Sequence, residues 1–292
     1  MSKSLEKPEI VKLVDLNFPP EVFIPIKSGK FIDKIISKKG GTMPGTITVV
    51  VGEPGSGKTT MLVDKMANIE KINPEKKCLY ISSEMNPIDN RELAEELPQL
   101  MQLHTIYMAD YDKPKNILEE VLEIGWDYVL IDSFMDVKDK IKDSENKLSA
   151  VAIESWLIRL LVKHTKGENQ AKKFTAFDVI QHITKGGEYA GSTKLKHNTT
   201  AMMYVRIDEY TGERYLVYVK NRRGDIRKKL YMSLNSSDGG IVYDVERYCE
   251  TENVFIDEIL DSEIENINLG EEYLNISNVH TEIDQFNTLP LN

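Results

Sequence analysis

The sequence is poor in cysteine, with only Cys78 and Cys249 among its 292 residues. Two thiols exclude both a disulfide framework and a four-cysteine zinc site. Apolar runs long enough to span a bilayer are also missing, and the first seven residues lack the hydrophobic segment of a signal peptide. The expected compartment is therefore the cytoplasm, and no membrane partner is expected.

Basic residues are missing from the C-terminal segment. Residues 248–292 contain eleven acidic residues and no Lys or Arg. The formal net charge is −10, so residues 1–247 carry about +1 once these eleven charges are set apart. The acidity is local, and the body of the chain can still present basic surfaces to a polyanion. We expect residues 248–292 to form an acidic, largely disordered tail.

One stretch has the pattern of a phosphate-binding loop. Residues 52–60 fit G-x-x-x-x-G-K-T and follow the β-branched run 46–51. A strand, a glycine-rich turn and the start of a helix are the context that a P-loop needs. The alternative is an ordinary glycine-rich turn. We predict that ATP binds to Gly52, Glu53, Pro54, Gly55, Ser56, Gly57, Lys58, Thr59 and Thr60.

Two side chains of this loop have expected roles in phosphate and metal binding. Lys58 would reach the β and γ phosphates, and the Thr59 hydroxyl would be a ligand of Mg²⁺. Asp132 ends the apolar run 129–131, as the acid of a Walker B segment does. It would hold Mg²⁺ opposite Thr59, directly or through water. Many strands end in Asp, and the P-loop upstream is what favours this interpretation.

The remaining pattern predicts an α/β fold. Strand-like runs alternate with helix-like segments, which is typical of a doubly wound, mostly parallel sheet with helices on both faces. Residues 134–150 are polar and rich in Lys and Asp, so we expect a loop there. The predicted strands lie at 77–82, 105–108, 126–132 and 174–181, and a C-terminal β-hairpin is predicted from 201–206 and 214–219.

The chain is expected to have three parts. Four prolines in residues 1–30 disfavour a long helix there. This segment is either an arm that packs on a neighbouring subunit or a flexible lead-in, and we favour the arm. Residues 31–247 form the predicted core, and residues 248–292 form the tail.

Three polar residues follow or end predicted strands. Glu84 comes just after the strand that follows the P-loop helix, and Gln181 and His182 end a later strand. The carboxyl ends of parallel strands line the ligand crevice. Glu84 could polarise the water that attacks the γ-phosphate, and Gln181 and His182 could contact that phosphate. The alternatives, an exposed glutamate and a structural histidine, stay open on the pattern alone.

Two basic segments are candidates for binding a polyanion. Residues 185–197 combine three glycines and an aromatic residue with Lys185, Lys194 and Lys196, which suits single-stranded DNA. Residues 220–224 read Lys-Asn-Arg-Arg-Gly, and adjacent cations repel one another unless an anion is near. That anion could be a γ-phosphate or DNA. A solvated loop and a surface charge run are the alternatives.

The order of these motifs resembles a RecA-superfamily core, closest to the RadA/Sms group and the DnaB-type helicase core. Residues 181–191 resemble the RadA stretch that runs from His-Val-Thr-Lys-Glu-Gly into a DNA-binding loop. Residues 220–224 resemble its Lys-Asn-Arg-Phe-Gly signature, with Arg223 in place of Phe. The resemblance, over residues 28–235, implies a hexameric ATPase ring on single-stranded DNA. It further implies a catalytic carboxylate at Glu84, a γ-phosphate sensor at Gln181 and His182, and cations for a neighbour's nucleotide at Lys220 and Arg222.

The sequence also departs from that family. RadA proteins carry an N-terminal zinc finger and a protease-like C-terminal domain, and DnaB proteins an N-terminal helical domain, whereas here we expect a bare motor core of the kind that phages encode. The predicted function is Mg²⁺-dependent ATP hydrolysis coupled to single-stranded DNA binding or translocation, in a homo-oligomeric ring serving replication or recombination, with helicase activity as one form. The alternatives are a KaiC-like oligomeric ATP-binding protein that DNA does not drive, and a small-molecule kinase, for which no lid or acceptor pocket is evident.

Overall fold

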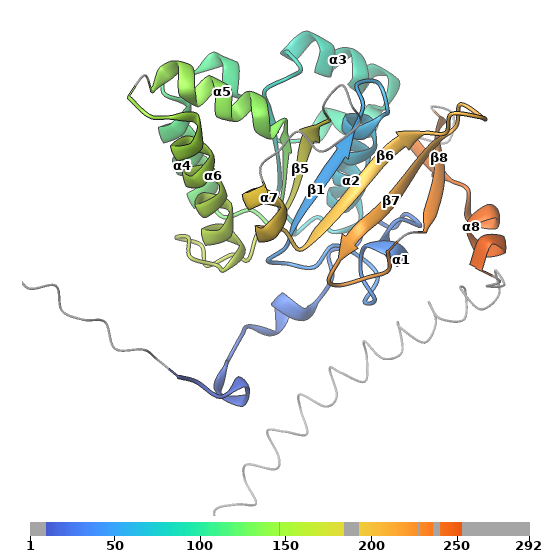
Figure 1. Ribbon diagram of the computed structural model, residues 1–292, viewed down its shortest axis with the longest axis horizontal. Coiled ribbons are helices and arrows are strands. Elements are labelled where there is room, and N and C mark those ends of the chain that lie inside the picture. The colour runs from blue at the N-terminus through green and yellow to red at the C-terminus, as the bar shows by residue number, and fades with distance from the viewer. Residues whose placement is uncertain (1–9, 146, 184–192, 227, 236–239, 253–292) are drawn as a thin grey trace, which may run out of the picture.

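A central twisted sheet flanked by helices forms the core of the computed structural model, which describes residues 10–145, 147–183, 193–226, 228–235 and 240–252 (Figure 1). The strands are β1 (Ile47–Gly52), β2 (Cys78–Ser82), β3 (Thr105–Tyr107), β4 (Tyr128–Asp132), β5 (Ala176–His182), β6 (Ala201–Ile207), β7 (Arg214–Asn221), β8 (Lys229–Asn235) and β9 (Gly240–Tyr243). The helices are α1 (Asp33–Ile36), α2 (Lys58–Ile72), α3 (Pro87–Glu96), α4 (Pro114–Glu123), α5 (Phe134–Ser144), α6 (Ala150–Thr165), α7 (Thr193–Asn198) and α8 (Val245–Glu252), with 3-10 turns η1 (Leu13–Asp15), η2 (Pro20–Phe23), η3 (Pro98–Gln102) and η4 (Met108–Asp110).

Within the described residues the strands form one sheet in the order β3-β2-β4-β5-β1-β6-β7-β8-β9. Neighbours from β3 to β6 are parallel, and the remaining pairs are antiparallel. This confirms the predicted α/β, mostly parallel sheet, and β6 and β7 form the predicted hairpin. The sheet continues past that hairpin into β8 and β9, which the sequence analysis does not predict.

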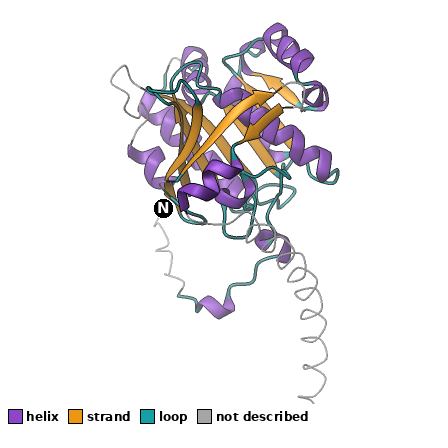
Figure 2. Ribbon diagram, turned by 90° about the vertical axis from the view of Figure 1, so that its right-hand side faces the viewer, coloured by secondary structure: helices purple, strands orange, loops and turns teal. Residues whose placement is uncertain are grey.

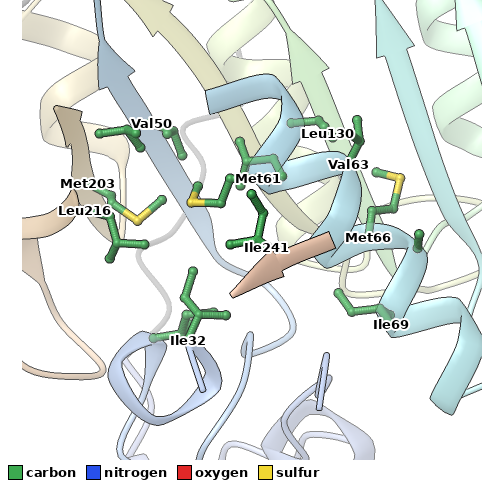
Figure 3. Close-up of a cluster of buried hydrophobic side chains, with 14 of the residues drawn as sticks. Ile32, Val50, Met61, Val63, Met66, Ile69, Leu130, Met203, Leu216 and Ile241 are labelled. Atoms are coloured by element: carbon green, nitrogen blue, oxygen red, sulfur yellow. The ribbon is translucent and has the colours of Figure 1, made fainter. Parts of the chain in front are cut away.

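Helix α2 packs on one face of the sheet. Its side chains Met61 and Met66 are fully buried in a cluster with Val50 of β1 and Leu130 of β4, and Ile241 of β9 joins the same cluster (Figure 3). Full burial of one such side chain contributes about 1.5–3 kcal/mol. The packing fixes the N-terminal end of α2 at the edge of the sheet where β1 ends.

Helices α5 and α6 cover the opposite face. Val137 of α5 and Leu157 and Leu161 of α6 are fully buried in a second cluster with Val49 and Val179 of the sheet. Helices therefore lie on both sides of the strands, as Figure 2 shows. Because both faces are covered, β1, β4 and nearly all of β5 are buried residue after residue.

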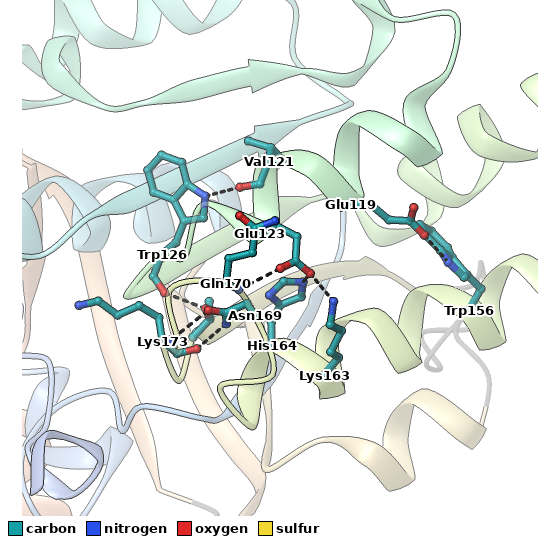
Figure 4. A network of polar contacts seen from close by, with 11 residues as sticks. Glu119, Val121, Glu123, Trp126, Trp156, Lys163, His164, Asn169, Gln170 and Lys173 are labelled. Atoms are coloured by element: carbon teal, nitrogen blue, oxygen red, sulfur yellow. Dashed lines mark hydrogen bonds and ion pairs between the residues drawn. The ribbon is translucent and has the colours of Figure 1, made fainter. Parts of the chain in front are cut away.

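Polar contacts tie α4 to α6 and to the loop that follows it (Figure 4). Glu123 at the end of α4 accepts hydrogen bonds from the Lys163 ammonium and, at 3.0 Å, from the backbone N–H of Gln170. The indole of Trp156 donates to Glu119 at 3.1 Å. These contacts fix the position of α4 relative to α6.

The loop predicted over residues 134–150 is wrong, because most of it is helical. Phe134, Val137 and Ile141 are buried at helical spacing, and the Ser133 hydroxyl accepts the N–H of Asp136 as an N-cap. The Lys and Asp residues that suggested a loop occupy the rest of this amphipathic helix. Residues 145 and 147–149, between this helix and α6, are not helical.

The two terminal segments differ from the core. Ile10, Leu13 and Val14 of the N-terminal arm are strongly exposed, and the arm leads away from the sheet in Figure 1. Phe18 contacts the Phe174 ring edge-on, with centroids 6.4 Å apart. Ile26 is the first buried residue described and bridges to Thr42. At the other end, residues 248–252 of the predicted tail belong to α8, and 253–292 lie outside the described residues. No helix in the described ranges combines the length and apolar character of a transmembrane span.

Candidate nucleotide-binding site

The predicted P-loop joins the end of β1 to the start of α2. Gly55 and Gly57 have φ angles of 76° and 91°, a region that residues with a Cβ rarely adopt. A Cβ at Gly52 would lie 2.2 Å from the carbonyl oxygen of Val205, so β6 runs directly beside the loop. The first turn of α2 has no side-chain cap. The N–H groups of this turn therefore face the loop opening, where a phosphate would accept hydrogen bonds from them.

Lys58 lies within this loop with its ammonium turned onto the loop backbone. It donates to the carbonyl oxygens of Gly52 at 3.0 Å and Glu53 at 2.7 Å. Burial lowers the pKa of Lys58, and the nearby carboxylates of Glu84 and Asp132 oppose that shift. A phosphate in the loop would give this buried ammonium a full negative partner in place of two carbonyl dipoles.

Thr59 and Asp132, the residues predicted to hold Mg²⁺, are in contact. The Thr59 hydroxyl donates to Oδ2 of Asp132 at 2.7 Å, and the Tyr80 hydroxyl donates to the same oxygen at 3.3 Å. Oδ1 of Asp132 is buried and has no hydrogen-bond partner among the described residues. A buried, half-satisfied carboxylate beside a threonine hydroxyl fits the oxygen ligands that Mg²⁺ prefers.

The buried charge of Asp132 has a consequence for stability. Burial raises the pKa of Asp132 from 3.8 to about 6, while the Thr59 hydrogen bond acts in the opposite direction. Between these values the unfolded chain has lost the proton and the folded chain keeps it, so stability falls as pH rises towards about 6. The loss is complete above that pH.

Replacement of Asp132 by Asn should therefore stabilise the nucleotide-free, Mg²⁺-free protein at pH 8. We expect Asp132→Asn to raise the free energy of unfolding by about 1–3 kcal/mol at pH 8, and by about half as much at pH 5. Urea unfolding of both proteins at the two pH values measures this difference. A gain that does not depend on pH, or a loss at pH 8, would contradict the assignment of a destabilising charge to Asp132.

Glu84 and His182 lie together at the same edge of the sheet. His182 Nε2 is 3.5 Å from Glu84 Oε2 and 3.8 Å from Asp136 Oδ2. The Ser133 hydroxyl donates to Asp136, which holds that carboxylate in place. These three side chains bring metal-type donor atoms within 4.8 Å of one another, so they could also hold a cation. The sequence analysis misses Asp136, whose only signal is its place one helical turn beyond the end of β4.

Gln181 occupies the next strand end and is fully buried. Neither its side-chain oxygen nor its nitrogen has a partner among the described residues. In the β1–β5 ladder Gln181 pairs with Val51, and His182 with Gly52. A buried amide costs free energy unless it is hydrogen-bonded, and a phosphate in the adjacent loop could supply that partner.

The predicted DNA-binding lysines are only partly described. Lys185 lies outside the described residues. Lys194 donates to the Ser155 hydroxyl of α6 at 2.8 Å, and Lys196 is exposed. Both side chains belong to α7, the short helix that follows residues 184–192.

Lys220 contacts the end of this same helix. Its ammonium donates to the carbonyl oxygens of Lys196 at 2.7 Å and Thr199 at 2.6 Å, so it caps the C-terminus of α7. Burial lowers the pKa of Lys220, and the nearby charges of Arg222 and Lys196 act in the same direction. Arg222 and Arg223 are exposed, and neither forms an ion pair within the described ranges.

The direction of β7 places these cations far from the P-loop of their own chain. β7 is antiparallel to β6, and Asn221 at its end pairs with Ala201, which in turn pairs with Thr48 near the start of β1. Gly52 lies four residues further along β1, about 13 Å away at the strand rise of 3.3 Å per residue. Lys220 and Arg222 thus lie at the edge of the sheet opposite to the loop.

Comparison with known proteins finds relatives by sequence and by structure. No protein-family model matches the sequence. The chain is 27% identical over 221 residues to the DNA repair protein RadA of Halalkalibacterium halodurans, which covers 75% of this chain and 45% of that protein. Among solved structures it resembles a KaiC-like protein of Pyrococcus horikoshii, with a TM-score of 0.56, 17% identity and coverage of 75% of this chain and 98% of that one. It also resembles the RadB recombinase, with a TM-score of 0.54, 19% identity and coverage of 74% and 98%. The chain is related in sequence to RadA and has a RecA-like fold.

The sequence relationship covers only part of each RadA protein. The chain spans less than half the length of the RadA proteins that it matches. The structural likenesses, both below 20% identity, establish the RecA-like fold alone. The comparisons therefore establish the fold of this core, and the evidence on its activity comes from the residues of the site.

Proposed function

We propose that this protein is a Mg²⁺-dependent ATPase that couples hydrolysis to binding or translocation on single-stranded DNA, as a homohexameric ring in replication or recombination. The observation that carries the proposal is the meeting of four strand ends at one edge. There the P-loop lies beside Asp132, Glu84 and the unpartnered amide of Gln181. Such a set of residues suits transfer of a γ-phosphoryl group to water.

Each residue has a distinct task in this proposal. Lys58 and the loop N–H groups bind the phosphates, and Thr59 and Asp132 hold Mg²⁺, which neutralises phosphate charge when bound. Glu84 accepts a proton from the attacking water. Gln181 and His182 contact the γ-phosphate and respond to its loss, because they end the strand that leads towards residues 184–192 and α7.

The proposed ring follows from the position of Arg222. The strand ends that carry Arg222 and the P-loop are about 13 Å apart along the strand direction, which favours a contact of Arg222 with the nucleotide of a neighbouring copy over one with its own. The exposed apolar side chains Ile10, Leu13 and Val14 of the N-terminal arm further support assembly, since a neighbouring subunit would cover them. Lys220 is a weaker candidate for a trans role, because it already caps α7.

The DNA part of the proposal rests on the RadA relationship and on the lysines of α7. It is tested by the rate of ATP hydrolysis with and without single-stranded DNA. We expect stimulation by DNA, and binding that weakens with a log–log salt slope of about −0.7 for each neutralised phosphate. Replacing Lys194 and Lys196 by Ala should lower the affinity and flatten that slope by about one to two units.

Matched lysines on α5 provide the control for this experiment. Replacing Lys140 and Lys142 by Ala removes the same charge from a different helix and should leave DNA affinity largely unchanged. If this pair matters and the α7 pair does not, the DNA contact lies on α5, with Lys138 as its third lysine. ATP hydrolysis that ignores DNA would contradict the proposal and favour the KaiC-like alternative.

A further inference from the structure

Arg214 is a cation that lies against the P-loop of its own chain, and no role follows for it from the site described above. It begins β7, and its Nη2 is 3.4 Å from the carbonyl oxygen of Gly55, at the outer limit of a hydrogen bond. A Cβ at Gly57 would lie 3.4 Å from Arg214 Cδ. The arginine side chain therefore covers the two loop glycines that have positive φ angles.

The hairpin that carries Arg214 is fixed relative to the loop. Val205 of β6 pairs with Gly52 in the parallel ladder, and Ile207 of β6 pairs with Arg214. Inside the turn, the Asp208 carboxylate accepts the N–H groups of Tyr210 and Thr211 at 3.0 and 3.2 Å. The position of Arg214 over the loop is thus set by the sheet and by an internally bonded turn.

Two acids of the same hairpin, Asp208 and Glu213, are already bound to other groups. Glu213 pairs with Arg247 at 2.9 Å, and Asp208 is bonded by Tyr231 at 3.1 Å and faces Lys229 at 3.8 Å. Within the described residues the Arg214 side chain forms no ion pair, and its one hydrogen bond is the long contact to Gly55. A guanidinium is always charged and favours phosphate as a bidentate partner.

We propose that Arg214 binds the α- or β-phosphate of the nucleotide held by its own chain. In the sheet order, the strands that lead to Glu84, Asp132 and Gln181 lie on one side of β1, and β7 lies on the other side, beyond β6. The γ-phosphate belongs to the first side, where the hydrolytic residues are. Arg214 then meets the part of the nucleotide that ATP and ADP share. This inference rests on the nucleotide binding proposed above.

The test is to measure the affinity for ADP and for a non-hydrolysable ATP analogue, with Mg²⁺, by calorimetry on the full chain. Arg214→Ala should lower the affinity for both ligands by the same factor. We expect about ten- to a hundred-fold, which is what a charge-assisted hydrogen bond contributes. Arg214→Lys keeps the charge and loses the planar guanidinium. Its affinity for both ligands should lie between that of the unmodified protein and that of Arg214→Ala.

Arg206 provides a matched control on the same hairpin. Its guanidinium lies over the Tyr204 ring at 4.7 Å, and because it precedes Ile207 it points to the opposite face of the sheet from Arg214. Arg206→Ala should bind both nucleotides as the unmodified protein does. Equal losses in the two alanine variants would mean a general effect of charge and would overturn the inference.

Three other results would overturn it. Unchanged ADP affinity in Arg214→Ala would exclude a contact with the shared phosphates, and a loss for the ATP analogue alone would assign Arg214 to the γ-phosphate. Normal binding with slow hydrolysis would place it on a neighbour's nucleotide. Lys58→Ala tests the proposed nucleotide site separately. If this variant binds nucleotide as well as the unmodified protein, the P-loop assignment fails, and the role inferred for Arg214 fails with it.

Discussion

Arg222→Ala should bind ATP almost normally and hydrolyse it about 10³- to 10⁵-fold more slowly, the range that a trans arginine contributes in other phosphoryl transfers. The affinity survives because Arg222 lies at the edge of the sheet opposite to its own P-loop. The rate falls because the γ-phosphate of the neighbouring copy loses the guanidinium that stabilises charge in the transition state. Nucleotide affinity and single-turnover hydrolysis, measured on the same preparation, separate the two effects.

Mixed assemblies make the prediction specific to a trans contact. Lys58→Ala spoils the nucleotide site of its own chain, whereas Arg222→Ala spoils that of its neighbour, so a mixture contains some interfaces with both groups intact. Mixing the two inactive variants should restore part of the activity. Arg223→Ala is the matched control and should retain most of the activity. Within the described residues, Arg223 forms hydrogen bonds through its backbone only: its carbonyl oxygen accepts the N–H of Lys38, and its N–H donates to Asn221 Oδ1. Co-assembly without recovery, or a monomer that hydrolyses ATP well, would exclude the trans role and the ring.

Glu84→Gln should keep ATP binding and lose at least about 100-fold in the rate of hydrolysis, the usual worth of a positioned general base. Glutamine preserves the size of the side chain but cannot accept the proton of the attacking water. In the structure Glu84 is half-exposed and lies 3.5 Å from His182, at the edge that carries the P-loop. Steady-state hydrolysis under saturating ATP measures the loss.

Asp136→Asn is the control for this prediction. It removes a carboxylate that lies 3.8 Å from the same histidine but is held by Ser133. A smaller loss than in Glu84→Gln is expected, because the base itself remains. Normal turnover by Glu84→Gln, or a larger loss in Asp136→Asn, would show that Glu84 is not the base.

The sequence predicts the elements whose patterns are strong and local. The β-branched run before the P-loop, the alternating strands and helices, and the meeting of Thr59 with Asp132 follow from motif spacing and from the shared edge of parallel strands. The prediction of a loop over α5 is wrong because the helical pattern there is weak. Its charges outnumber its apolar residues, so the helical spacing of Phe134, Val137 and Ile141 is easily missed.

Features that depend on three-dimensional assembly could not be predicted. Nothing local to Arg214 says that β7 begins over the P-loop, because this follows from the register of β6 with β1. In the same way, Lys220 caps α7 only because β7 ends beside that helix. Strand β9 has only four residues, and β8 carries lysine and asparagine at its ends, so both give weak patterns.

In the proposed ring, strand β7 would connect two different nucleotide sites. Its first residue, Arg214, contacts the loop of its own chain, and Arg222 follows directly after its last residue, Asn221. The intervening backbone is extended and pairs with β6 along its length and with β8 over residues 214–217. In a ring, consecutive nucleotides would thus be joined by one stiff rod of about 26 Å rather than by loops. In such a ring, a displacement of β7 at one nucleotide would be transmitted to the next, and neighbouring sites would then hydrolyse ATP in sequence.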